Sequence, residues 1–223
     1  MRTGHWIILA ALVPAVIDWV AVRRRRKRME YIFKPATLLT FLAGASLLAR
    51  DPSSGWQARF FLIGLICSLV GDLFLMLPDE QRYFVPGLGA FLLAHVGYII
   101  GLNRSPPPLT SLLLWIPVAG LGGWLTRAIV AGARRRGQGD LVAPVVVYSI
   151  ALSLMLFSAW ATLFRPTWGA PQRLLVILGG SLFFASDTML AWDRFVHPST
   201  TLRQAVIVTY HLGQMALAAS IAR

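Results

Sequence analysis

Long apolar runs alternate with short polar segments along almost the whole chain. A transmembrane helix needs about 20 consecutive, mostly apolar residues, and eight runs reach or approach that length. They are Trp6–Val22, Tyr31–Ala49, Ala58–Leu77, Phe84–Leu102, Leu109–Val130, Leu141–Phe164, Pro171–Trp192 and Leu202–Ala222. Because no polar segment is long enough for a soluble domain, the pattern predicts an all-α polytopic membrane protein. Residues 1–223 would form one bundle of eight transmembrane helices.

The segments between the runs carry residues that favour turns, such as Asp51-Pro52-Ser53-Ser54-Gly55 and Ser105-Pro106-Pro107-Pro108. The first run is expected to be a retained span and not a signal peptide. Its basic cluster, Arg23–Arg28, follows the apolar stretch, whereas a signal peptide carries its charges before it.

Composition supports the membrane interpretation. Hydrophobic residues make up 57% of the chain and charged residues 13%, with a mean hydropathy of +0.65. A soluble domain is about 45–50% apolar and about 25% charged. The net charge of +12 does not indicate a nucleic-acid partner, because the basic residues lie in short clusters between apolar runs. Cys67 is the only cysteine, so no internal disulfide is expected.

The Lys and Arg residues predict which end of the bundle faces the cytoplasm. Of the 21 in the chain, two thirds fall after the first, third, fifth and seventh spans. Cytoplasmic loops carry the excess of positive charge, so both termini are expected outside the cytoplasm. In a bacterium the location would be the inner (plasma) membrane. The basic clusters are also suited to membrane lipids with anionic head groups.

A weak internal repeat relates two halves, about 1–102 and 109–223. Aligning Asp72 with Asp187 places other polar or small residues in register to within one position. The matched pairs are Gly64 with Gly179, His95 with His211 and Lys34 with Tyr148. Two parallel repeats of four helices would produce this pattern, and chance similarity is the alternative.

Ionisable residues inside membrane spans are costly and by default mark a functional site. At 1.5 Å per residue, Asp72 lies about 21 Å and Asp187 about 24 Å along spans that run toward the cytoplasm. Polar residues of other spans reach the same half of the bilayer or its middle: Lys34, Tyr148, Tyr210, His211 and His95. Four more lie beside these candidates: Ser68, Tyr98, Ser186 and Gln214. The shared depth indicates one site.

Each candidate also has a structural interpretation. Lys34 near a helix end is able to extend to the interface, or to form an ion pair with Asp72. The histidines and tyrosines are able to act as hydrogen-bonding links between helices. Asp18 and Asp193 lie near membrane boundaries and are expected to be structural.

Five segments resemble, in order and spacing, motifs of the lysoplasmalogenase family (YhhN-like integral membrane proteins). They are KPATLLTFLAG, SLVGDLFLML, FVPGLGAFLLAHVGYI, SLFFASDTMLAWDRF and YHLGQMAL. The resemblance implies an eight-span hydrolase that cleaves the vinyl ether bond of a lysoplasmalogen, a lysophospholipid substrate within the bilayer. The products would be a fatty aldehyde and glycerophosphoethanolamine or glycerophosphocholine. Asp72 and Asp187 would be the catalytic pair, with no cofactor.

Two carboxyl groups suit that chemistry. A vinyl ether is hydrolysed by proton addition to the alkene carbon that is not bonded to oxygen, which gives an oxocarbenium ion that water captures. One carboxylic acid supplies the proton, and a charged carboxylate stabilises the cation. The sequence leaves open which Asp has which role. Lys34, nearest the cytoplasmic surface, is expected to bind the phosphate. The tyrosines and histidines would orient water and the carboxylates.

Two alternatives remain from the residues. Asp72, Asp187, His95 and His211 have the donor atoms for Zn²⁺ in a metal-dependent membrane lipid hydrolase, although no close pair of histidines marks such a site. A non-enzymatic lipid or proton-coupled transporter would also use buried Asp and His. A serine hydrolase is less favoured, because Ser68 and Ser186 lack a G-x-S-x-G motif.

Overall fold

A computed structural model describes residues 2–221, and within them every regular element is helical. The order is α1 (Thr3–Ala10), α2 (Leu12–Arg23), α3 (Lys27–Leu48), η1 (Pro52–Ser54), α4 (Gly55–Met76), α5 (Glu80–Leu102), η2 (Leu109–Leu114), α6 (Trp115–Arg135), η3 (Gly139–Leu141), α7 (Val142–Ala161), η4 (Thr162–Phe164), α8 (Ala170–Phe195) and α9 (Thr200–Ala219). The predicted all-α class is confirmed.

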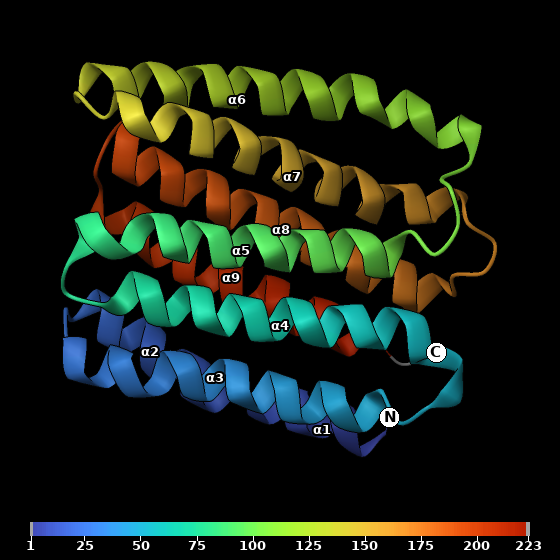
Figure 1. Ribbon diagram of the computed structural model, residues 1–223. Helices are drawn as coiled ribbons and strands as arrows, with labels where there is room; N and C mark the ends of the chain where they lie inside the picture. Colours follow the sequence, from blue (N-terminus) through green and yellow to red (C-terminus); the bar gives the residue numbers. More distant parts are fainter. Residues whose placement is uncertain (1, 222–223) are drawn as a thin grey trace.

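The helices lie side by side as a bundle, with α1 to α3 at one edge and α6 and α7 at the other (Figure 1). α9 lies behind α4 and α5 in this view. The most extensive helix–helix contacts join α4 to α5 and α8 to α9. Contacts of α5 with α7 and of α3 with α9 join the two halves of the sequence in one core.

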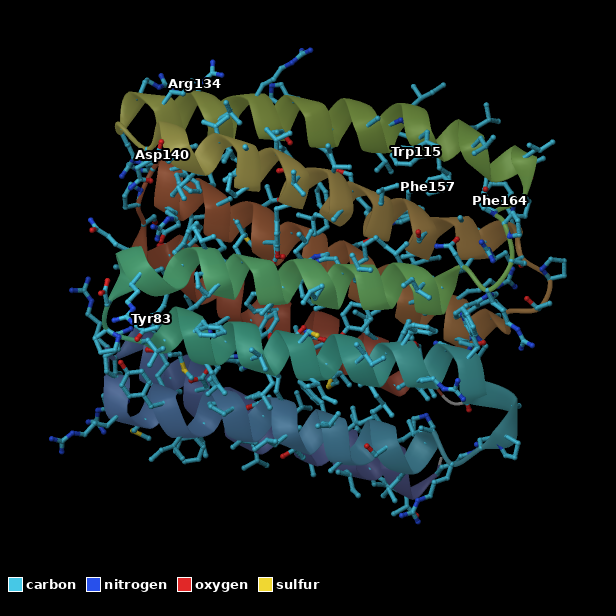
Figure 2. The ribbon with its side chains drawn as sticks, in the orientation of Figure 1. Tyr83, Trp115, Arg134, Asp140, Phe157 and Phe164 are labelled. Carbon is cyan, nitrogen blue, oxygen red and sulfur yellow. The ribbon has the colours of Figure 1, made fainter. Side chains whose placement is uncertain are left out.

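The surface of the bundle has the polarity expected of a protein in lipid. Large apolar side chains point outward along α6, and Ile116 is 75% exposed. Charged residues gather at the ends: Figure 2 places Arg134 and Asp140 at one end, with Phe164 at the other. The turn that follows α2, with its basic cluster, lies at the same end as Arg134 (Figure 1). We call this end of the bundle the basic end.

Seven helical segments among the described residues are long and apolar enough to cross a membrane. They correspond to the first seven predicted spans, and the protein is an integral membrane protein. The eighth, α9, is less apolar because it is surrounded by protein, packing against α8, α3, α2 and α4. Its polar residues in the middle of the span, Tyr210, His211 and Gln214, are buried against other helices. The predicted end of this span, Ala222, lies outside the described residues.

The first span is interrupted at Ala11, between α1 and α2. Pro14 lies four residues after Ala10, where its ring displaces the Ala10 carbonyl and its missing N–H removes one helical hydrogen bond. The break therefore follows from the sequence, although the hydropathy pattern alone predicts one continuous helix.

The end of α6 packs closely on the end of α8. A Cβ added at Gly132 would overlap the backbone carbonyl oxygen of Phe195, whereas one added at Gly123 on the same helix would meet nothing within 4 Å. We expect Gly132→Ala to destabilise the fold by about 1–3 kcal/mol, and Gly123→Ala to be neutral or stabilising because Ala favours helix. Thermal unfolding of both variants in detergent checks this. Equal unfolding temperatures would contradict the close contact.

Candidate active site

Asp72 is held between a cation and a phenol in the core of the bundle. It lies one turn before α4 ends and is 1% exposed. The Lys34 ammonium, from α3, is 3.0 Å from Asp72 Oδ1. The Tyr210 hydroxyl, from α9, donates a hydrogen bond of 2.7 Å to Oδ2. Both carboxylate oxygens therefore have a donor, and three helices meet at this group.

Asp187 has a different set of partners. It lies two turns before the end of α8 and is 7% exposed. The Tyr148 hydroxyl, from α7, donates a hydrogen bond to Asp187 Oδ2. His95 Nε2, from α5, lies 3.4 Å from the same oxygen. The other ring nitrogen, Nδ1, is 2.6 Å from the Phe91 carbonyl oxygen. A carbonyl only accepts, so Nδ1 carries a hydrogen.

The ring of Phe183 contacts a partner of each acid. The centroid of the Phe183 ring is 5.6 Å from that of Tyr210 and 4.9 Å from that of His95. Asp72 and Asp187 therefore belong to separate hydrogen-bonded groups, although the two carboxyl groups still interact electrostatically. The two predicted catalytic acids are therefore coupled electrostatically and not by a direct hydrogen bond.

Other predicted residues support these groups. The Tyr98 hydroxyl donates to Gln214 Oε1 at 2.6 Å, and Gln214 also interacts with Tyr210. Ser68, one turn before Asp72, lies beside the Tyr98 hydroxyl. These contacts connect α4, α5 and α9 and fix the position of the Tyr210 ring.

Ser186 and His211 link helices at the edge of the site. The Ser186 hydroxyl donates to the Val206 carbonyl at 3.0 Å, joining α8 to α9. The Trp19 indole N–H, from α2, donates to His211 Nδ1 at 3.1 Å. Among the described contacts, these two side chains join neighbouring helices, which for His211 agrees with the interpretation of a histidine that links helices.

The two remaining aspartates differ. Asp193 accepts from the Ser199 backbone N–H at 2.6 Å and from Arg203 Nε at 3.2 Å, which stabilises the turn between α8 and α9 as expected of a structural residue. Asp18, predicted at the membrane boundary, is fully buried and interacts electrostatically with Lys34 and Asp72. The charge environment of Asp72 therefore includes a third carboxyl group, from α2.

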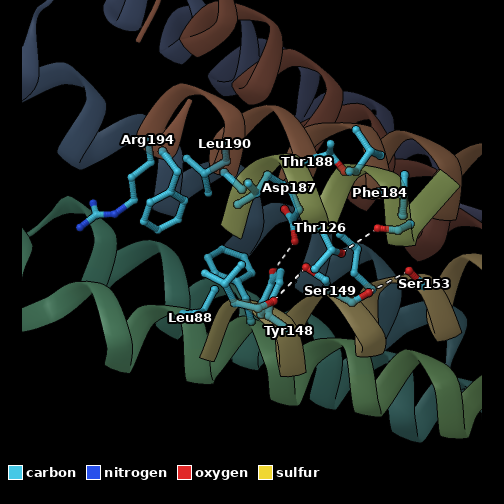
Figure 3. Close-up of a pocket in the computed structure, with 18 of the residues that line it drawn as sticks. Leu88, Thr126, Tyr148, Ser149, Ser153, Phe184, Asp187, Thr188, Leu190 and Arg194 are labelled. Carbon is cyan, nitrogen blue, oxygen red and sulfur yellow. Dashed lines mark hydrogen bonds between the residues drawn. The ribbon is translucent and has the colours of Figure 1, made fainter. Parts of the chain in front are cut away.

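A narrow cavity, partly open at the surface of the bundle, lies between α5, α6, α7 and α8. Its wall is mostly apolar, and Figure 3 shows Asp187 and Tyr148 facing each other in the middle of it. Asp72 and Lys34 are not among the residues that line it. Of the two predicted catalytic acids, only Asp187 is therefore in contact with the cavity.

The cavity wall contains polar residues that the sequence did not single out. Thr126, Ser149 and Ser153 line it, and each hydroxyl donates to the carbonyl one turn earlier in its helix. Arg194 also lines the cavity (Figure 3). It lies in the last turn of α8, in the part of the cavity nearest the basic end of the bundle. One signal was available, because Arg194 follows Asp187 by seven residues and two helical turns place both on one face.

The contacts of the acids match the alignment of the two halves. Lys34 and Tyr148, which that alignment equates, each contact the Asp of their own half. Close crossings also correspond, because Gly97 approaches the α4 backbone and Gly213 the α8 backbone. The internal repeat itself stays a prediction.

The four ligands of the zinc alternative do not form one cluster. Within residues 2–221, no three His, Cys, Asp or Glu side chains come close enough together to hold a metal ion. His95 faces Asp187, while His211 accepts from Trp19 and its ring lies against those of Trp19, Phe41 and Tyr210. The histidines are thus divided between two surroundings.

Comparison with known proteins connects this site to a family. The chain matches the YhhN family over residues 29–221. Human lysoplasmalogenase TMEM86B is 31% identical over 179 residues, 79% of this chain and 69% of that protein. The Sus scrofa protein of the same name is 34% identical over 182 residues, with the same coverage. The lysoplasmalogenase of Mycobacterium tuberculosis is 30% identical over 173 residues, 74% of this chain and 61% of that protein. No solved structure matches.

The family match spans every predicted site residue, from Lys34 on α3 to Gln214 on α9. It therefore covers both acid groups and all the helices that surround the cavity. The earlier resemblance is confirmed: the chain belongs to the YhhN family.

Proposed function

We propose that this protein hydrolyses the vinyl ether bond of lysoplasmalogens within the membrane, releasing a fatty aldehyde and a glycerophospho-alcohol. The relatives named lysoplasmalogenase support the substrate class. The observation that carries the proposal is a carboxyl group, Asp187, hydrogen-bonded by Tyr148 in the wall of an otherwise apolar cavity. An apolar cavity accepts a lipid chain, and the carboxyl group supplies the proton that a vinyl ether needs.

Asp187 is the acid in this proposal. Since His95 Nδ1 carries a hydrogen for the Phe91 carbonyl, a neutral His95 presents an Nε2 lone pair to Asp187. Two lone pairs facing each other repel, so one proton belongs between Oδ2 and Nε2. A proton on Asp187 leaves both groups neutral, which is the less costly arrangement in a region of low dielectric constant. Asp187 would thus be protonated, as a carboxylic acid, before the reaction begins.

Asp72 is the charged carboxylate. Its two oxygens receive the Lys34 ammonium and the Tyr210 hydroxyl, and donors of this kind favour the ionised form. From outside the cavity it would act through space, with its negative charge offsetting the positive charge that develops on the substrate.

The reaction then balances with one water molecule. The alkene electron pair takes the proton of Asp187 at the alkene carbon that bears the hydrocarbon chain, leaving an oxocarbenium ion at the carbon bonded to oxygen. Water adds to that carbon and gives a proton back to the Asp187 carboxylate. The hemiacetal loses its hydroxyl proton to the glycerol oxygen as the C–O bond breaks, giving the aldehyde and the alcohol. Glycosidases pass through a similar cation between two carboxyl groups.

Purified protein in detergent tests the proposal. We expect a lysoplasmalogen to release fatty aldehyde, and its saturated-ether and ester analogues to remain intact, because neither offers an alkene carbon to protonate. A chelator should leave the rate unchanged. Cleavage of the ester, or loss of activity that added Zn²⁺ restores, would favour a different hydrolase. Movement of intact substrate across liposomes without aldehyde would favour a transporter.

A further inference from the structure

Asp18 is a buried carboxyl group that the proposed mechanism does not use. It lies on α2 and is fully buried, and neither of its oxygens has a hydrogen-bond partner among the described residues. It also precedes residues 29–221, the part of the chain that matches the family. Buried polar atoms in native proteins almost always have a partner, either protein or ordered water. Asp18 therefore points to a site for a small polar molecule in the core.

His211 brings an unused hydrogen to the same region. Its Nδ1 accepts the Trp19 indole N–H at 3.1 Å, so a neutral ring carries its hydrogen on Nε2. In the described part of the chain, this buried Nε2 has no hydrogen-bond partner. Trp19 directly follows Asp18 in α2. The bond to Trp19 thus brings His211 against the turn of α2 that carries Asp18.

The Lys34 ammonium is the third group. It lies within electrostatic range of both Asp18 and His211. An ammonium has three N–H donors, and the partner of Lys34 within residues 2–221 is Asp72, at 3.0 Å. Asp18 thus attracts the Lys34 ammonium without reaching it by a hydrogen bond. An ordered water molecule commonly bridges polar groups at such a separation.

We propose that Asp18, Lys34 and His211 together bind an ordered water molecule. A buried water makes about three hydrogen bonds, and this one would accept from Lys34 and from His211 Nε2 while donating to Asp18. The water would hold the Lys34 ammonium in place beside Asp72. Asp18 is thus a positioning residue that acts on Asp72 through the water and Lys34. The water site goes beyond the proposed function, and the positioning role rests on it.

The balance of charge favours a neutral Asp18. Asp72 already balances Lys34, and Lys27 lies 3.4 Å from Glu30, the other carboxylate nearby. An ionised Asp18 would add an uncompensated charge to the core, which is costly. Asp18→Asn therefore keeps the shape, the charge and an oxygen that accepts from water. Asp18→Leu keeps only the shape.

Thermal unfolding in detergent tests the water site, because the two possible results have opposite signs. With water bound, Asp18→Leu should lower the apparent unfolding temperature by about 2–8 °C, while Asp18→Asn stays within about 2 °C of the wild type. If the oxygens of Asp18 are simply unpaired, Asp18→Leu removes them without loss and the temperature rises, which would overturn the proposal. An equal loss in both variants would overturn it as well.

His211→Asn is the partner variant, because the Asn oxygen still accepts from Trp19 while the Nε2 hydrogen is lost. Combined with Asp18→Leu, it should cost little more than the more harmful single change, since both break one water bridge. Additive losses would exclude a shared water. If a variant fails to fold, a density map of the wild type decides. The proposal requires a water peak about 2.7–3.2 Å from Asp18, Lys34 and His211, and ordered water elsewhere in the core but not there would overturn it.

Rates of aldehyde release test the positioning role. Asp18→Leu should lower kcat about 3- to 30-fold with KM within about twofold, because Asp18 is not in the cavity wall. Asp18→Asn should keep the wild-type kcat. Gln57→Met, which removes a buried hydrogen bond to Ser220 at the opposite end of the bundle, is the matched control. It should lower the unfolding temperature but not kcat, and an equal fall in kcat would contradict the positioning role. If the wild type releases no aldehyde, the proposed hydrolysis fails while the unfolding results still decide on the water site.

Discussion

Replacing Asp187 by Asn is expected to lower kcat for vinyl ether cleavage by about 100- to 10,000-fold, the usual contribution of a positioned general acid. Asn has nearly the same shape, and its amide oxygen still accepts the Tyr148 hydrogen bond. It has no acidic proton to give to the alkene carbon, so the chemical step is lost while the cavity remains. Initial rates of aldehyde release at saturating substrate measure the effect.

Asp193→Asn is the matched control for this variant. It lies on the same helix but accepts its hydrogen bonds from the turn before α9 and is not part of the cavity wall. We expect its kcat to stay close to that of the wild type. An Asp187→Asn protein that keeps near-wild-type activity with a normal elution profile would exclude Asp187 as the acid.

Replacing Asp72 by Asn is expected to destabilise the protein by about 3–5 kcal/mol, because it leaves the buried Lys34 ammonium without its counter-charge. Activity should fall as well, since the negative charge that stabilises the cation is removed. The apparent unfolding temperature in detergent and the rate of aldehyde release separate the two effects.

A double variant distinguishes the structural from the catalytic role of Asp72. Lys34→Gln combined with Asp72→Asn removes both charges, so most of the lost stability should return. Activity should not return, because no carboxylate remains. Full recovery of activity in the double variant would mean that the Lys34–Asp72 ion pair serves only the fold.

The helices were predictable because lipid imposes a simple rule on the sequence. Each span must be about 20 apolar residues, and α3, α4, α5, α7 and α8 all follow that rule. The break at Ala11 depends on one proline, which a hydropathy average hides. α9 departs from the rule and packs against five other helices, α8, α3, α2, α1 and α4, a property that its own sequence does not reveal.

The candidate site was predictable in part for a similar reason. Buried polar residues stand out against an apolar background, and Asp72, Lys34, Tyr148, Asp187 and His95 do form the two groups described above. These residues form two hydrogen-bonded groups and not one. Which residues meet depends on the rotation of each helix about its axis, which composition does not determine.

The place of Arg194 in the cavity wall was hidden for another reason. Near the end of a span it has the appearance of an ordinary topology signal. Only the packing of α5, α6, α7 and α8 reveals that it faces a cavity. The position of Asp18 in its run predicts a place near a membrane boundary but not its contacts, and the packed bundle buries its side chain completely.

Hydrolysis in D₂O tests the central claim most directly. The aldehyde is trapped by immediate reduction to the alcohol, and its deuterium content is measured by mass spectrometry. Proton transfer from Asp187 to the alkene predicts one deuterium on the carbon next to the former carbonyl carbon, formed at a rate that Asp187→Asn abolishes. An aldehyde without deuterium, or the same labelling rate in Asp187→Asn, would contradict acid catalysis by this residue.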